Sequence, residues 1–135
     1  RFAFYRLDRI KEVCKSNECT NKNEMMMRAD TAVQKLWGVS FGKENYTEKL
    51  EMTVRIAKDE EYILKRLERE KRNGTIQKLA NGDYKFTAEV YDASEMVPWI
   101  KTFTGRIVEI KCSNERVEKQ IKEDFEMMKR IYEVR

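Results

Sequence analysis

Alternation of apolar and polar residues, broken by two helical stretches, is the feature that most limits how this chain can fold. It begins at Leu50, where apolar side chains at every second position predict a half-buried strand as far as Ile56. The same spacing predicts further strands over residues 75–80, 84–91 and 106–112. Asn81, Gly82 and Asp83 favour a hairpin turn between the first two of these. A sheet with at least one buried face is therefore expected.

The stretches of sequence between and after these predicted strands show helical periodicity. Asp59 is expected to cap a helix that ends at Asn73 and Gly74, two residues that tolerate a positive φ. A second helix is predicted from Ser94 to Thr104, stopping at Gly105. A third follows residues 113–114, with an apolar stripe formed by Val117, Ile121, Phe125, Met128, Ile131 and Tyr132. Its stripe must pack on the open sheet edge, on the preceding segment or on another subunit.

The order β-α-β-β-α-β-α indicates the fold class. It is α+β, and its first six elements match the split βαβ arrangement of a ferredoxin-like domain, followed by an extra C-terminal helix. Residues 11–49 are less regular. A short helix is expected between Asp30, as its cap, and Gly38, and a polar loop over residues 15–23. Met25, Met26 and Met27 suit an adaptable contact surface or a barrel strand.

The first ten residues predict a strand that is already under way. Phe2 and Phe4 fall on one face, and Ala3, Tyr5 and Leu7 on the other, which suggests a strand covered on both faces. A strand needs a partner, and no neighbouring segment supplies one. The chain is therefore expected to be a fragment of a larger sheet.

The segment 5–10 (Tyr-Arg-Leu-Asp-Arg-Ile) resembles the arginine-bearing strand near the end of the WYL domain, found in bacterial transcriptional regulators. Segments 95–100, 103–110 and 126–132 resemble the tryptophan helix, glycine turn with last strand, and terminal helix of the WYL C-terminal extension. The resemblance implies two parts. Residues 1–49 would be the remnant of a partial SH3/Sm-like β-barrel with a short helix and linker, and residues 50–135 the ferredoxin-like extension.

What the resemblance implies about function is an effector-sensing and dimerisation unit. Such regulators are dimers in which the WYL region senses a ligand, in some cases single-stranded nucleic acid. Arg6 and Arg9 would then present guanidinium groups to an anionic effector such as single-stranded nucleic acid or a nucleotide, and Tyr5 could stack on a base. Neither the Trp-Tyr-Leu motif nor the DNA-binding domain is present in this chain. Duplex DNA would be bound only through that missing domain.

Other interpretations of the same residues stay open. Arg6 and Arg9 could form salt bridges with Asp8 or Glu12, and Tyr5 could belong to the core. Trp37 and Trp99 favour core packing over stacking. The dense cations of residues 65–72 favour a solvated mixed-charge face, because glutamates are interleaved with them, over a nucleic-acid surface. Two alternatives to the regulator are a small-molecule-binding ferredoxin-like domain of the amino-acid-sensing type and a purely structural dimerisation module.

Composition narrows the classes of function. Lysine and arginine total 28 against 24 acidic residues, so the net charge of +4 permits an anionic partner without requiring one. Histidine is absent, and no phosphate-binding or nucleophile motif occurs, so we expect neither an enzyme nor a cofactor. Cys14, Cys19 and Cys112 are too few for a metal site, and their odd number favours a reducing, cytoplasmic compartment. No apolar run is long enough for a membrane span.

Overall fold

A four-stranded antiparallel sheet forms the centre of the fold in the computed structural model, which describes residues 2–17, 21–43 and 45–133. The strands are β1 (Glu48–Val54), β2 (Thr75–Lys78), β3 (Tyr84–Val90) and β4 (Ile107–Cys112). They lie in the order β2-β3-β1-β4, so β1 and β3 are central and every neighbouring pair is antiparallel. The expectation of an α+β fold is confirmed.

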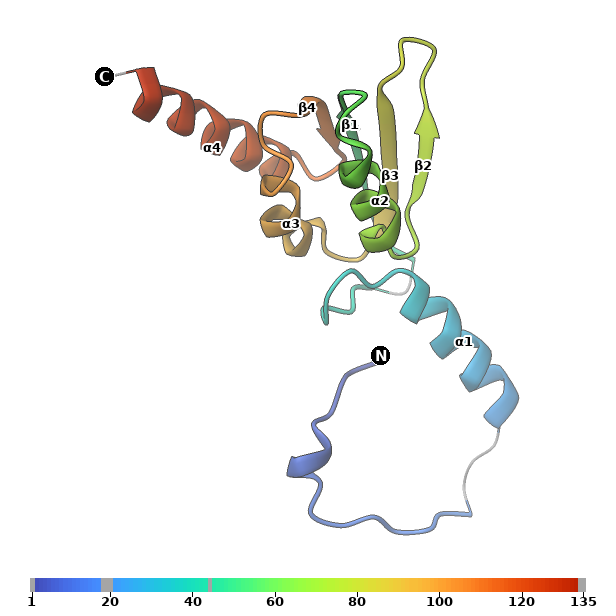
Figure 1. The fold of residues 1–135 in the computed structure, drawn as a ribbon. Coiled ribbons are helices and arrows are strands. Elements are labelled where there is room, and N and C mark those ends of the chain that lie inside the picture. Colours follow the sequence, from blue (N-terminus) through green and yellow to red (C-terminus); the bar gives the residue numbers. More distant parts are fainter. Residues whose placement is uncertain (1, 18–20, 44, 134–135) are drawn as a thin grey trace.

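Four α-helices and two short 3-10 turns complete the described part of the chain. The helices are α1 (Lys22–Gln34), α2 (Glu61–Glu70), α3 (Val97–Lys101) and α4 (Glu115–Glu133). The 3-10 turns are η1 (Leu7–Arg9) and η2 (Ala93–Met96). Figure 1 shows α2 and α3 on one face of the sheet, α4 leading away from it, and α1 running outward below the end of β3. The sheet therefore has one face covered by helices.

The core lies between the sheet and these helices. Leu50, Met52 and Val54 of β1 are fully buried, as the alternation predicted, and they share one cluster with Leu67 of α2 and Ile100 of α3. Burying one aliphatic side chain stabilises a fold by about 1.5–3 kcal/mol, so this cluster provides the main driving force for folding. The buried residues of the cluster that come from outside the sheet, α2 and α3 are Trp37, Ala93, Met96, Phe103, Val117 and Ile121. Trp37 is thus a core residue, as predicted.

Charged residues occupy the opposite face of the sheet. Glu51 of β1 accepts ion pairs from Lys49 at 3.4 Å and from Lys85 of β3 at 3.5 Å. On β4, Lys111 lies 3.2 Å from Glu109. The pair between Glu51 and Lys85 links adjacent strands, and each of the other two pairs lies within one strand. These charged side chains offer no aromatic platform for stacking bases.

A register shift between β1 and β4 makes the burial of residues in β4 differ from the prediction. In the strand predicted over residues 106–112, Val108 alternates with Ile110 and Cys112 and would share their buried face, but it is exposed. The pairing of β1 with β4 shifts between Thr53 and Val54, so that one extra residue stands on β4 and the alternation is interrupted there. A bulge of this kind requires a partner strand and cannot be identified from alternation alone.

Two helix boundaries also differ from expectation. Glu60, not Asp59, precedes α2, and its carboxylate accepts a hydrogen bond from the Ala57 N–H at 3.3 Å. After α2 the positive φ falls on Arg72, at 52°, and not on the Asn-Gly pair that follows. Gly74 is needed for a different reason, since a Cβ there would stand 2.4 Å from the Phe86 ring. The glycine allows the turn to approach the core closely.

The helix predicted over residues 94–104 is divided into η2 and α3. Asp92 caps this region, because its carboxylate accepts the N–H of Ser94 at 3.0 Å. Pro98 stands in the first turn of α3, where its missing N–H costs nothing. Gly105, with φ at 87°, follows the helix and leads into β4, as expected from its position.

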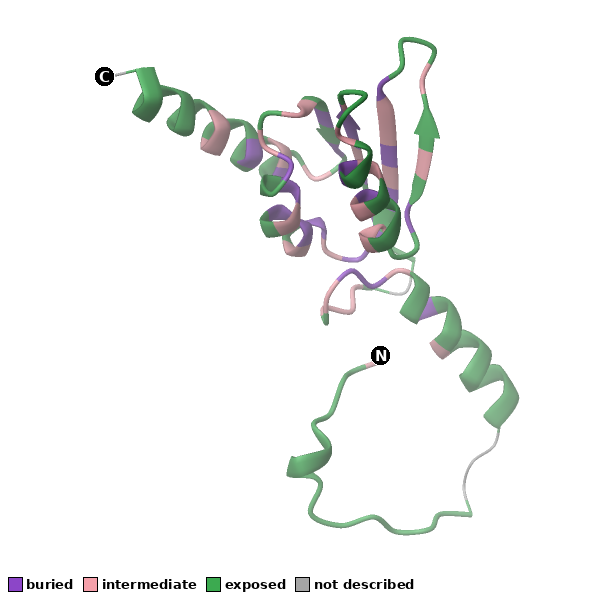
Figure 2. Ribbon diagram, in the orientation of Figure 1, coloured by how far each residue is buried: buried purple, intermediate pink, exposed green. Residues whose placement is uncertain are grey.

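The N-terminal segment, residues 2–17, contains no strand, so the predicted strand over residues 1–10 is wrong where the structure describes it. Its regular structure is the single turn η1, and all its residues except Phe2 are exposed (Figure 2). No described residue before Glu48 belongs to a strand, so the described part of residues 1–49 contains no β-barrel strand. A strand is stable only when a neighbour takes up its backbone hydrogen bonds, and none lies beside this segment.

Helix α1 is longer than predicted and begins earlier. It includes Met25, Met26 and Met27, whose side chains are largely exposed, so the barrel-strand interpretation of this run is wrong. Asp30 lies inside the helix and not at its cap. Residues 18–20, within the predicted polar loop, lie outside the described part of the chain.

Helix α4 is buried only in its first half. Val117 and Ile121 enter the core, and Phe125 is partly covered. An ion pair of 2.5 Å between Lys101 and Asp124 holds this half against α3. Beyond it, Met127, Met128, Ile131 and Tyr132 are exposed to between 36% and 66%, so the distal apolar stripe packs on nothing else in the described chain.

Candidate functional site

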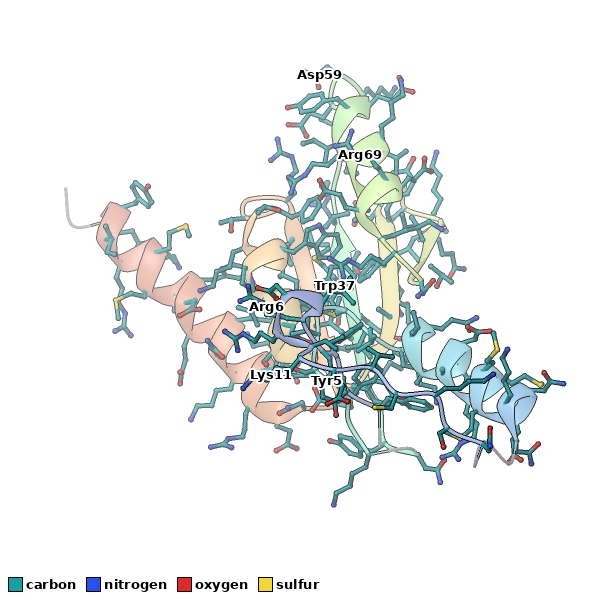
Figure 3. All side chains as sticks on the ribbon, turned by 90° about the horizontal axis from the view of Figure 1, so that it is seen from below. Tyr5, Arg6, Lys11, Trp37, Asp59 and Arg69 are labelled. Atoms are coloured by element: carbon teal, nitrogen blue, oxygen red, sulfur yellow. The ribbon has the colours of Figure 1, made fainter. Side chains whose placement is uncertain are left out.

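The three residues predicted to bind a ligand lie together on the N-terminal segment but do not form a closed site. Tyr5 is 81% exposed, which rules out a core position for its side chain in this structure. Arg6 is paired with Asp8, its Nε donating to Oδ1 at 3.0 Å and its Nη2 to Oδ2 at 2.5 Å. Arg9 is exposed next to them. Figure 3 shows Tyr5 and Arg6 extending from the segment.

A larger concave site lies where the N-terminal segment and α1 meet the end of the sheet. It is an open cavity of about 1060 Å³, and we call it the aromatic cavity. Its lining residues are Phe2, Glu24, Met27, Arg28, Thr31, Ala32, Lys35, Phe41, Gly42, Lys43, Asn45 and Tyr91. They come from four separate stretches of sequence, which is why no local sequence motif predicted the site.

Aromatic rings form one wall of the aromatic cavity. The ring of Phe41 lies 6.1 Å from that of Tyr91 and 6.1 Å from that of Phe2, centroid to centroid. Phe4, on the same N-terminal segment, is closer to Phe41, at 5.0 Å. Offset and tilted aromatic contacts of this length are favourable. The N-terminal segment therefore touches the rest of the protein at the wall of this cavity.

Backbone hydrogen bonds hold the cavity walls in place. The Tyr91 N–H donates to the Lys35 carbonyl at 2.9 Å, which joins the end of β3 to the end of α1. The linker that follows is fixed by Glu95, whose carboxylate accepts the N–H groups of Val39 and Ser40 at 2.9 and 3.3 Å. A glycine is required at position 42, since a Cβ would stand 2.9 Å from the Tyr91 ring. These contacts make the aromatic wall part of the folded structure.

The rim of the aromatic cavity is mostly cationic. Arg28, Lys35 and Lys43 line it together with one carboxylate, that of Glu24. Cations at the mouth of an apolar cavity attract anions, because the low-dielectric wall reduces screening. Such a cavity fits a ligand that combines a planar apolar group with a negative charge.

The two described cysteines are free, and they differ in exposure. Within the described chain, no three acidic or cysteine side chains are arranged to share a metal ion. Cys14 is exposed and hydrogen-bonded to Glu12, and Cys112 is buried in the core, where burial raises the pKa of its thiol. Cys19 lies outside the described residues.

The dense cations of α2 are largely paired within the helix. Lys65 lies 3.5 Å from Glu61, and Arg66 lies 3.1 Å from Glu70, both one turn away. Pairs of this spacing favour the solvated mixed-charge interpretation of this helix. Arg72, two residues beyond the helix, is an exception, because it forms no ion pair with the described residues and lies over the Trp37 ring.

Comparison with known proteins adds no relative. No family model matches the chain, and no curated protein or solved structure is significantly similar to it. In the part of the chain that the structure describes, none of the helices has the length and apolar character needed to cross a membrane.

Proposed function

We propose that this chain is the effector-sensing and dimerisation part of a DNA-binding transcriptional regulator of the WYL type. Its effector would be an anion that carries a planar group, such as a nucleotide or single-stranded nucleic acid. The observation that carries this proposal is the aromatic cavity, with rings of Phe41 and Tyr91 on its wall and three cations on its rim. Aromatic rings stack on bases, and guanidinium and ammonium groups pair with phosphates.

The topology supports the assignment of residues 50–135 to a ferredoxin-like extension. Two β-α-β units connected by the β2-β3 hairpin, with the strands in the order β2-β3-β1-β4, are the split βαβ arrangement. Helix α4 is then the additional element that the resemblance implies. Because this architecture hosts many unrelated activities, the functional part of the proposal rests on the cavity and not on the fold.

In this proposal, the N-terminal segment is the element that senses the effector. Phe2 and Phe4 reach the cavity wall through Phe41, while Arg6 and Arg9 follow them on the same segment. We propose that a bound anion draws these arginines toward the cavity and exchanges the contact of Arg6 with Asp8 for one with the ligand. Such a change regulates only if the effector binds the two arrangements with different affinity.

Dimerisation is proposed to use the distal half of α4. Its exposed apolar side chains continue the buried stripe of the first half and have no cover in the described chain. Contiguous apolar surface of this kind is a mark of an interaction site. A second copy of the chain is the proposed partner, in line with the dimers typical of such regulators.

The test is an anisotropy titration of a fluorescein-labelled single-stranded oligonucleotide with the full chain. Lys35→Gln with Lys43→Gln removes two rim cations, and Lys58→Gln with Lys119→Gln removes two exposed lysines outside the cavity. We expect the cavity variant to lower the affinity at least about tenfold, and the control less than about twofold, as the loss of two placed phosphate contacts requires. Phe41→Leu should also weaken binding by removing a stacking ring.

Two results would contradict the proposal. Equal weakening by both lysine variants would mean a generic, salt-sensitive basic surface. If neither the oligonucleotide nor a mononucleotide binds the chain, the result would instead favour a small-molecule effector of another class.

A further inference from the structure

The two tryptophans of the chain meet in a second cleft, on the helical side of the sheet. The rings of Trp37 and Trp99 are 4.8 Å apart, and Trp99 also contacts Phe86 and Phe103 edge to face. Three arginines lie beside this pair: Arg66 and Arg69 of α2, and Arg72, two residues beyond its end. The resulting cleft of about 400 Å³ is lined by Trp37, Arg66, Arg69, Glu70, Arg72 and Trp99, and we call it the arginine–tryptophan cleft. It shares no lining residue with the aromatic cavity.

We propose that the arginine–tryptophan cleft binds a small oxyanion, either a phosphate group or a carboxylate. Figure 3 shows Arg69 on α2 and Trp37 nearer the middle of the molecule. A guanidinium group offers two parallel N–H donors, which match the geometry of two oxygens on one phosphorus or carbon atom. The size of the cleft suits one such group with a short substituent.

The charges in the cleft are unbalanced, which is the first argument for an anion. Glu70 is the one carboxylate of its lining, and it is already engaged. It accepts from Arg66 Nε at 3.1 Å and from Trp99 Nε1 at 2.8 Å. Arg69 reaches it only at 3.7 Å, and 75% of the Arg69 side chain is exposed. Two of the three guanidinium groups therefore have little or no compensation from the single carboxylate.

Arg72 is the second argument. Among the described residues it has no ion pair, and its guanidinium carbon lies 4.9 Å above the Trp37 ring. Its φ of 52° is unfavourable for a residue with a Cβ, although Asn73 and Gly74 follow directly and would tolerate that conformation. Strained residues outside glycine are often retained where they place a functional side chain. Here the strained backbone places a guanidinium group over the cleft.

The C-terminal end of α2 disfavours anion binding in the cleft and therefore limits the expected affinity. A helix C-terminus acts as roughly half a negative charge, which disfavours an anion close to it. Three guanidinium groups against one carboxylate outweigh that partial charge, and the cation–π contact keeps Arg72 in position at little entropic cost. The balance predicts weak binding, with a dissociation constant on the order of 1 mM for a simple oxyanion.

Tryptophan emission provides the test, because all indole fluorescence of the chain comes from Trp37 and Trp99. The full chain is titrated with inorganic phosphate and, separately, with malonate, at an ionic strength held constant with sodium chloride. We expect a saturable change in emission for at least one of them. The tighter of the two identifies the oxyanion as phosphate or carboxylate.

The decisive variant is Arg72→Asn, which removes the guanidinium and tolerates the left-handed backbone conformation. It should weaken binding at least about tenfold, which is about 1.4 kcal/mol. Arg116→Gln, which removes the same charge from an exposed position outside the cleft, should leave the affinity within about twofold. If the Arg72 variant does not fold, Arg69→Gln takes its place, because that side chain is largely exposed.

A purely structural role for Arg72 makes a different prediction. The variant would then change the emission of the free protein while leaving the response to phosphate and malonate intact. That result would overturn the proposal, as would an unsaturated change that chloride reproduces. Because this cleft and the aromatic cavity are tested with different ligands and different variants, failure of one proposal does not imply failure of the other.

Discussion

Glu48 joins three parts of the domain, and replacing it should measurably destabilise the fold. It begins β1 and is only 6% exposed. Its carboxylate accepts the N–H of Ala93, at the start of η2, at 2.7 Å, and the side-chain amide of Asn114, just before α4, at 2.9 Å. One buried carboxylate thus holds the sheet, the η2 turn and the start of α4 together.

The size of the effect follows from these two contacts. A hydrogen bond to a charged group contributes about 1.5–3 kcal/mol, and Asn114 is half-buried, so water can replace part of its contact. We therefore take the lower end for each bond and expect Glu48→Ala to cost about 3 kcal/mol. Glu48→Gln can still accept from Ala93 but turns a donor toward Asn114, so about half that loss is expected. The larger loss is a substantial part of the 5–15 kcal/mol typical of a small domain.

Equilibrium urea unfolding measures this loss as a shift of the midpoint at an unchanged slope. Glu89→Ala is the matched control, since Glu89 is an exposed glutamate on β3 and its removal should change the free energy by less than about 0.5 kcal/mol. The reasoning is refuted if Glu48→Ala costs less than about 1 kcal/mol, or if the control costs as much.

Three further predictions concern packing, assembly and pH. Gly74→Ala should destabilise the fold by about 1–3 kcal/mol in urea unfolding, because its Cβ would meet the buried Phe86 ring. Ile131→Glu should convert the proposed dimer into a monomer in light scattering, because it places a charge in the distal α4 stripe. Burial raises the pKa of the Glu70 carboxyl, but hydrogen bonds from Arg66 and Trp99 more than offset this and hold it below its ordinary value. Because its folded-state pKa is depressed, the stability that it contributes is present near pH 7 and lost as the pH falls through that pKa; the difference in unfolding free energy between Glu70→Gln and the wild type should therefore shrink on acidification.

Each of these predictions has its own control or contrary outcome. Gly82→Ala meets no atom within 4 Å and tests the strain of a positive φ alone, so a smaller loss is expected there than at Gly74. Gln120→Glu adds the same charge to an exposed residue in the first half of α4, and it should not change the molar mass. A wild-type mass equal to one chain at every concentration would contradict dimerisation. A stability difference for Glu70→Gln that does not change with pH would contradict the depressed pKa.

The strands and the hairpin could be predicted from the sequence because each depends on local information. Leu50, Met52 and Val54 alternate with polar residues, and a strand with one covered face is the simple way to bury such a pattern. Residues 81–83 form the turn between β2 and β3, and Gly105 ends the α3 region with a positive φ. These residue types favour the observed backbone wherever they occur.

Alternation gave wrong predictions where strand formation or burial depended on a neighbouring strand. Phe2, Phe4 and Tyr5 alternate with other residues as a strand would, yet they form none, because no neighbouring strand takes up their backbone hydrogen bonds. Val108 follows the alternation of β4 but is displaced by the bulge opposite Thr53 and Val54. Strand pairing is a property of two segments, and one segment's sequence does not contain it.

Both candidate sites depended on tertiary structure for the same reason. The sequence by itself determined the four strands of the sheet, the helical stretches between and after them, and the excess of cations, each of which reflects residues close together in the chain. The aromatic cavity brings Phe41 against Tyr91, and the arginine–tryptophan cleft brings Trp37 against Trp99 and Arg72. These residues are tens of positions apart, and only the packing of the linker after α1 against the sheet and α2 places them together. Recognition of a ligand requires groups from several elements at once, so it was settled by the fold.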